Sequence, residues 1–266
     1  MPQGVIVELS NRELKSLSRW ALKGNWSRCF TAMLLYYLVV NIPQILLLEI
    51  FGYKESMLDV LNVYSILITS PLALGLAMFF LSVLRRRQAQ PVEIFYGFEF
   101  VLKAVLLEVI MAMLIFLQLL LFLIPGLVAI YRYSAAIFIL ADDPSKSVIQ
   151  CIRESGQLMR GNKLQLFFLT LSFIGWYALC SVPIYFSVQL RMHVPMQPLT
   201  FELINLASGL GLLFLMPYIM MAICAFYEIT NGHLKVCRSV EGTSAVSQEA
   251  QDAQDMREQQ DGGADD

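Results

Sequence analysis

The sequence predicts an all-α membrane protein with six transmembrane helices and two amphipathic helices that lie at the cytoplasmic face. Of its 266 residues, 57% are hydrophobic and 15% are charged, and the mean hydropathy is +0.62. Soluble domains have about 45–50% apolar and about 25% charged residues. Apolar runs of about 20 residues, the length that crosses a ~30 Å hydrocarbon layer, recur along the chain. Lysine and arginine are also distributed very unevenly between the connecting segments.

Residues 1–28 are expected to form a cytoplasmic segment with the first amphipathic helix. Ser10 and Glu13 have the spacing of a capping box, in which each side chain accepts from the other residue's backbone N–H. Gly24 suits the end of this helix because glycine adopts the left-handed conformation easily. Glu8 and Glu13 interrupt the segment, which argues against a signal peptide.

Six apolar segments within residues 29–230 are predicted to cross the membrane. Several contain a proline that is expected to kink the helix, including Pro217 in the last segment. Residues 91–100 (PVEIFYGFEF), which include Gly97, are expected to lie along the membrane surface as a short aromatic stretch. The predicted spans are residues 29–50, 63–84, 103–124, 127–141, 164–188 and 203–227.

Pro125 and Gly126 are expected to break the helix between the third and fourth spans. Proline cannot donate a backbone hydrogen bond, and glycine tolerates the conformations that reverse a chain. The pattern therefore predicts a tight helical hairpin with its turn at these two residues.

The second amphipathic helix is predicted between the fourth and fifth spans. Asp143 is a suitable N-cap, and Pro144 suits the first helical position. Gly161 is expected to end the helix. The apolar face is expected to hold a set of residues at helical spacing, namely Val148, Ile149, Ile152 and Met159.

The charge distribution predicts that both termini are cytoplasmic. With six spans, sixteen of the 19 Lys and Arg residues fall in inner segments, whereas only Lys54 and Arg191 fall outside and Arg132 lies within a span. Such a bias is typical of cytoplasmic loops and indicates a multi-pass protein of the plasma membrane. Residues 231–266 are acidic and rich in glutamine, and they are expected to form a disordered cytoplasmic tail that docks partner proteins.

Several motifs together resemble one bacterial integral membrane family, known as domain of unknown function 975. The resemblance covers about residues 10–230 and implies a multi-helix membrane fold without an established activity. The family is distantly similar to the membrane domain of some glycerophosphodiester phosphodiesterases. The motifs are FYGFEF (95–100), LIPGLVAIYRYSAAIFILADDP (123–144), ESGQLMRGNK (154–163), LSFIGW (171–176), MPY (216–218) and FYE (226–228).

No combination of residues in the sequence predicts catalysis. The two histidines, His193 and His233, are expected on opposite sides of the membrane, and motifs for phosphate binding, serine hydrolysis or zinc binding are absent from the sequence. We therefore expect a protein that is not an enzyme and that uses no metal, cofactor or nucleic-acid partner.

Charged and polar residues within the spans are the stronger functional indication, because such groups are costly in lipid. If Pro125 is the apex of a hairpin, Arg132 is level with Gln118, and Glu108 is level with Asp142 near the inner surface. Arg132 either extends outward to the interface, near Glu49 or Glu202, or anchors an anionic lipid or peptide between helices. In the second case, Tyr131, Tyr133 and Gln118 are expected to contribute to the same site.

Two functions remain open from the sequence. One is a transport-like or lipid- or peptide-binding role, in which kinked spans and buried polar groups shelter a ligand. The alternative is a structural or accessory role, in which the amphipathic helices and the acidic tail dock partner proteins. A polar cavity that reaches Arg132 would favour the first role, and dense packing around it would favour the second.

Overall fold

The computed structural model describes residues 6, 9–51, 55–86, 89–194 and 197–233, and within these ranges the chain is helical without a strand. Lys54 and nearly all of the predicted acidic tail lie outside the described residues. The docking role of that tail therefore stays a prediction.

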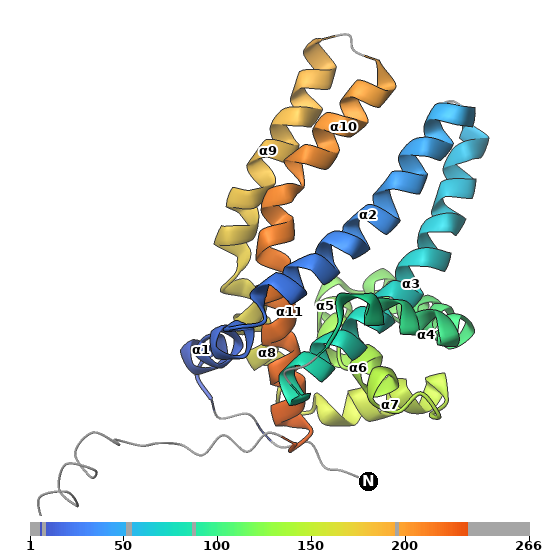
Figure 1. Ribbon diagram of the computed structural model, residues 1–266. Helices are drawn as coiled ribbons and strands as arrows, with labels where there is room; N and C mark the ends of the chain where they lie inside the picture. The colour runs from blue at the N-terminus through green and yellow to red at the C-terminus, as the bar shows by residue number, and fades with distance from the viewer. Residues whose placement is uncertain (1–5, 7–8, 52–54, 87–88, 195–196, 234–266) are drawn as a thin grey trace, which may run out of the picture. The chain divides into compact units, whose positions relative to one another are not determined.

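The described residues contain five helical stretches that are long and apolar enough to cross a membrane. A sixth is present if α8 and α9, which are bent by 47° at their junction, form one span. These stretches are α2 (Trp26–Phe51), α3 (Glu55–Arg86), the 3-10 helix η1 (Pro91–Phe100) with α4 (Val101–Leu121), α5 (Leu123–Tyr133) with α6 (Ala136–Asp142), α8 (Lys163–Leu171) with α9 (Ile174–His193), and α11 (Leu210–Thr230). Figure 1 shows α2 and α3 as a helical hairpin.

The first amphipathic helix is α1 (Asn11–Leu22), and it begins with the predicted capping box. The Ser10 backbone N–H donates to Glu13 at 2.7 Å, and the Glu13 N–H donates to Ser10 Oγ at 3.3 Å. Gly24 follows the helix with φ +86°, which is the expected left-handed conformation. The apolar side of α1 packs on protein, because Leu14 and Leu22 are buried and α1 contacts α11.

The segment 91–100, which is predicted to lie along the membrane surface, packs against α3. It forms η1, which crosses α3 so closely that glycine is required on both elements. A Cβ atom on Gly97 would lie 1.9 Å from the Pro71 carbonyl oxygen, and one on Gly75 would lie 1.7 Å from the Ile94 oxygen. Ile94 is fully buried in this contact. Two small residues thus allow the backbones to touch, as in other close helix crossings within membranes.

The break between α4 and α5 lies at Phe122, three residues before the predicted position. Phe122 has extended backbone angles, and Pro125 falls in the first turn of α5, where its missing N–H costs nothing. Gly126 does not have a positive φ among the described glycines. Gly126 is buried, and a Cβ atom at this position would lie only 2.4 Å from the Leu119 side chain. Close packing of α4 on α5, rather than the turn itself, therefore requires this glycine.

The second amphipathic helix, α7 (Val148–Leu158), begins later than predicted. Its N-cap is Ser147, whose hydroxyl accepts from the Gln150 N–H at 3.3 Å. Asp143 instead ends α6 and accepts from the Ser145 backbone and hydroxyl. Ile149 is 65% exposed and does not share the buried face of Ile152. Contacts of α7 with α4, α5 and α6 select a face that the spacing alone does not identify.

Gly161 follows α7 with φ +85° and ends this region as predicted. The last two predicted spans are each divided in the structure. Residues 164–188 fall on α8 and α9, which are separated at Ser172 and Phe173. Residues 203–227 begin within α10 (Pro198–Ser208) and continue beyond Gly209 in α11. Pro217 is buried inside α11.

Replacing Gly97 by alanine is predicted to destabilise the protein by about 1–3 kcal/mol, because the new methyl group overlaps the α3 backbone. The matched control is Gly175→Ala in α9, where a Cβ atom would meet nothing within 4 Å. This control is expected to be neutral or to stabilise its helix by about 0.5–1 kcal/mol. Thermal unfolding of both variants in the same detergent measures the difference. Equal stability of the two would contradict the close crossing.

Candidate functional site

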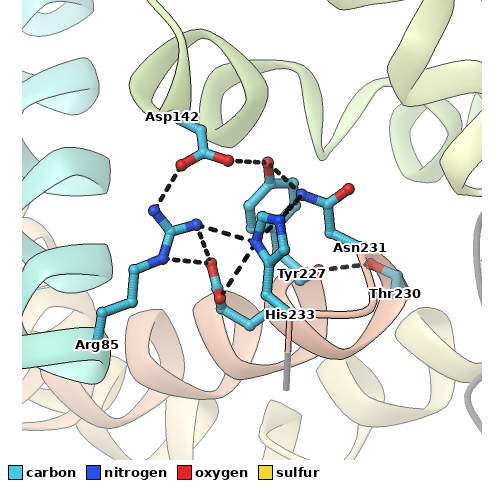
Figure 2. Close-up of polar contacts among 7 residues, drawn as sticks. Arg85, Asp142, Tyr227, Thr230, Asn231 and His233 are labelled. Atoms are coloured by element: carbon cyan, nitrogen blue, oxygen red, sulfur yellow. Dashed lines mark hydrogen bonds and ion pairs between the residues drawn. The ribbon is translucent and has the colours of Figure 1, made fainter. Parts of the chain in front are cut away.

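The C-terminal ends of three helices meet at one arginine. Arg85, in the last turn of α3, forms ion pairs with Asp142 at the end of α6 and Glu228 near the end of α11. Both Nη–O distances are 2.5 Å, and Arg85 Nε also donates to Glu228 Oε1 at 3.1 Å (Figure 2). The Glu228 side chain is only 2% exposed, against 35% for Arg85. We refer to Arg85, Asp142 and Glu228 as the ion triad.

Aromatic and polar side chains extend the ion triad. Tyr227 stacks on Phe138 with ring centroids 5.4 Å apart, and its hydroxyl donates to Asp142 Oδ2 at 3.4 Å. His233 Nδ1 lies 3.6 Å from Glu228 Oε2 and 3.3 Å from Arg85 Nη2 (Figure 2). The cluster thus joins residues that lie more than 140 positions apart in the sequence.

The electrostatics of the helix ends explain this arrangement. Each helix has a partial negative charge at its C-terminus, which a nearby cation stabilises. Here three C-terminal regions and two carboxylates converge, and the planar guanidinium can bind both carboxylates at once. A pocket of about 460 Å³ adjoins the triad and is lined by Arg85, Asp142, Tyr96 and Glu99 among others.

The four residues that the sequence predicted as a ligand contact do not form one site. Gln118 Nε2 donates to the Tyr133 hydroxyl at 3.4 Å, and the Arg132 guanidinium lies over the Tyr133 ring at 5.5 Å. These three are therefore neighbours, as their predicted depth implied. Tyr131 instead faces α8, where its hydroxyl is 3.1 Å from Thr170 Oγ1 and its ring packs edge-on against Phe167.

Arg132 itself points toward α7. A methyl group on Gly156 would lie 3.1 Å from Arg132 Nε, and the Ser155 hydroxyl donates to the Arg132 carbonyl oxygen at 2.8 Å. The side chain is therefore directed at the second amphipathic helix. Its binding of an anionic lipid or peptide stays a prediction.

The largest of the four pockets described here is an apolar chamber of about 640 Å³. Its walls come from α2, α3, α6, α9, α10 and α11 and from Ser134, which precedes α6. Leucine, isoleucine, methionine and alanine side chains form most of its surface. The lining residues are Met33, Tyr36, Tyr37, Ala73, Leu76, Ala77, Ser134, Ile137, Phe138, Ile184, Asn205, Gly209, Leu212, Leu213, Met216, Met220 and Ile223.

Three polar groups that line the apolar chamber are hydrogen-bonded to protein. The Tyr37 hydroxyl donates to the Leu206 oxygen at 3.1 Å, and the Ser134 hydroxyl donates to the Tyr131 oxygen at 3.0 Å. Asn205 Oδ1 accepts from the Ser187 hydroxyl at 3.4 Å. An apolar chain can therefore occupy the chamber without leaving these groups unpaired.

Outside the predicted spans, a second set of charged side chains lies on α7 and the loop before it. Lys146 and Glu154 form an ion pair at 2.7 Å. Hydrogen bonds from the Ser145 hydroxyl and backbone N–H hold the pKa of Asp143 below its ordinary value. Asp143 is therefore ionised over a wider pH range than an isolated aspartate. Within the described residues, no group of three or more His, Cys, Asp or Glu side chains is arranged to hold a metal ion.

The model of a family described as "Protein of unknown function (DUF975)" matches residues 119–232. The matched region contains α5 to α11, including Asp142 and Glu228. It begins after Arg85 and Glu108 and therefore does not include them. The comparison thus supports the predicted family over this part of the chain. No curated protein and no solved structure matches the sequence.

Sequence reasoning did not identify the ion triad. In the sequence, Asp142 is predicted only to be level with Glu108, and Glu228 is identified only as part of the motif FYE. An acidic residue near the end of each of two apolar segments, with an arginine at the end of a third, was the available signal. Their pairing requires the packing of α3, α6 and α11, which the sequence does not display.

Removing the cation of the ion triad is predicted to destabilise the protein. Arg85→Ala leaves the buried Glu228 carboxylate unpaired, and we expect a loss of about 2–3 kcal/mol because partial exposure of Arg85 reduces the full cost of breaking a buried pair. Adding Glu228→Gln should recover part of this loss, since it removes the unpaired charge. The comparison variant is Lys146→Ala, whose acidic partner Glu154 is 24% exposed against 2% for Glu228, so that we expect a loss of about 0–1 kcal/mol.

Thermal unfolding in detergent measures all of these variants. If Arg85→Ala were no more harmful than Lys146→Ala, the ion triad would not hold the three helix ends together.

Proposed function

We propose that this protein is a membrane-embedded binding protein of the transport-like class, which holds the apolar chain of an amphiphile from the bilayer. The apolar chamber carries this proposal. Its volume of about 640 Å³ falls within the range of about 300–1,000 Å³ that is usual for ligand pockets, and its lining is apolar with a few placed polar groups.

The surroundings of the apolar chamber support a lipid acyl chain as its occupant. Its walls include α2, α3 and α11, each of which contains a stretch long and apolar enough to cross a membrane. The most abundant apolar molecules beside such helices are lipid acyl chains. Burial of a chain in the chamber would also fill a void that otherwise costs dispersion contacts.

The remaining assignments are proposals that the sequence supports. We propose that both termini are cytoplasmic and that the protein lies in the plasma membrane of a bacterium, and the uneven distribution of lysine and arginine supports the proposed orientation. A role without catalysis agrees with the absence of recognisable catalytic motifs from the sequence. The accessory alternative depends on the amphipathic helices and on the acidic tail, and nearly all of that tail lies outside the described residues.

The apolar chamber can be tested by filling it. Ala73 lines the chamber on α3, and Ala73→Phe is predicted to exclude an acyl chain. The matched control is Ala178→Phe, at an exposed position of α9. Protein in nanodiscs would be irradiated with a phospholipid that carries a diazirine in its acyl chain, and labelled peptides would be mapped by mass spectrometry.

In the unchanged protein, the label is expected at chamber residues of α11 such as Leu213 and Met220. Ala73→Phe should reduce this labelling about tenfold, which corresponds to about 1.4 kcal/mol of binding free energy. Ala178→Phe should leave it unchanged. Labelling confined to outward positions such as Phe214, which is 58% exposed, would overturn the proposal.

A further inference from the structure

The Arg132 side chain lies across the surface of α7 at Gly156. A Cβ atom on Gly156 would lie 3.1 Å from Arg132 Nε and 3.6 Å from Nη2. The buried Ser155 hydroxyl donates to the Arg132 carbonyl oxygen at 2.8 Å, so α5 is attached to α7 at the same point. Glycine has no Cβ atom and lets another group approach its helix closely. Position 156 therefore provides the space that the guanidinium occupies.

Two more arginines belong to the same part of the surface. Arg153 precedes Gly156 by three positions, and residues at this spacing are neighbours on one side of a helix. Arg160 follows Gly156 by four positions, in the turn directly after α7. Both residues are exposed, as is Arg132. We refer to Arg132, Arg153 and Arg160 as the arginine cluster.

The carboxylates of this region are bonded to other groups. Glu154 forms its ion pair with Lys146 at 2.7 Å and accepts from Gln150 Nε2 at 2.9 Å. Asp143 accepts from the backbone and the hydroxyl of Ser145. In the part of the chain that the structure describes, no member of the arginine cluster forms an ion pair with a carboxylate. Three positive charges are therefore available to an anionic ligand.

Exposed apolar side chains border the arginine cluster and indicate what kind of anion it binds. Each arginine lies four residues from one of them, which within α5 and α7 is about one helical turn. α5 also belongs to a stretch that is long and apolar enough to cross a membrane. Positive charge beside exposed apolar surface matches a molecule with an anionic head and apolar chains. The apolar neighbours are Val128 in α5, Ile149 in α7 and Leu164 in α8, which are 44%, 65% and 70% exposed.

We propose that the arginine cluster binds the phosphate group of an anionic phospholipid, whose acyl chains lie along the apolar neighbours. A guanidinium group donates two parallel N–H bonds to phosphate oxygens, a contact that lysine cannot reproduce. A headgroup with net negative charge is favoured over a zwitterionic one, because three cations repel a choline ammonium group. None of the three arginines lines the apolar chamber, so this site is separate from the proposed function and does not depend on it.

Dioleoylphosphatidylglycerol and dioleoylphosphatidylcholine test the site, because they have the same acyl chains and differ in the charge of the headgroup. Each lipid would be titrated into the full-length protein in detergent, and bound lipid would be counted by native mass spectrometry. The unchanged protein is expected to bind phosphatidylglycerol about tenfold more tightly than phosphatidylcholine. Arg132→Gln and Arg153→Gln should each reduce this preference about threefold, and the double variant should remove it. Arg132→Lys should restore it only in part.

The matched control is Arg12→Gln, which removes an exposed arginine of α1 outside the arginine cluster and should leave the preference unchanged. Thermal unfolding checks that each variant is folded. If Arg132→Gln fails to fold, Arg153→Gln at its exposed position still tests the site. Equal binding of the two lipids by the unchanged protein would overturn the proposal. An equal loss of preference in Arg12→Gln and Arg153→Gln would also overturn it, because the effect would then follow from net charge alone.

Soluble competitors test the other occupants of a basic surface. Displacement of phosphatidylglycerol by an equal concentration of glycerol 3-phosphate would show that the chains contribute nothing and would overturn the assignment to a lipid. Displacement by an equal concentration of hexaglutamate would favour docking of an acidic protein segment and would overturn it as well. Ala73→Phe should lower the total lipid bound without changing the preference for phosphatidylglycerol. Failure of the apolar chamber and failure of the arginine cluster are therefore distinguishable.

Discussion

The arrangement of the C-terminal ends of α3, α6 and α11 depends on the ion pairs of Arg85 with Asp142 and Glu228. Three helix C-termini and two carboxylates repel one another unless a cation lies between them, and the buried Glu228 has little solvent to screen its charge. The guanidinium satisfies both carboxylates and fixes α3, α6 and α11 at a common level. Because α3, α6 and α11 also form walls of the apolar chamber, the same ion pairs hold part of the chamber in place.

The close crossing of α3 and η1 is a second constraint on the position of α3. The crossing with η1 brings backbone against backbone at Gly75 and Gly97, and α3 also carries Ser70 and Ala73, five and two residues before Gly75. The position of the Ser70 hydroxyl relative to Glu108 therefore depends on the close α3–η1 crossing at Gly75 and Gly97. In this way packing, rather than a polar motif, brings a carboxyl group to the side of the chamber.

The structure divides the four residues that the sequence grouped into one ligand site around Arg132. Arg132, Gln118 and Tyr133 are neighbours, whereas Tyr131 faces α8 and Arg132 is directed to α7. The intramembrane polar group that lines a pocket beside the apolar chamber is Glu108. Counting residues from the predicted hairpin turn gives a depth for Arg132 and for Glu108. The depth of a residue does not indicate which side of its helix the side chain occupies. That direction follows from which neighbouring helix each face contacts.

The sequence by itself determined the helical, apolar class of this protein, the capping box at Ser10 and Glu13, and the glycine ends at Gly24 and Gly161, because these depend on local backbone chemistry and composition. Tertiary structure decided the break at Phe122, the buried face of α7 and the division of the last two predicted spans. It also decided the ion triad, the apolar chamber and the contact of Glu108 with Ser70. Each of these depends on residues far apart in the chain, whose meeting is governed by side-chain volume and by the pairing of charges after the helices pack.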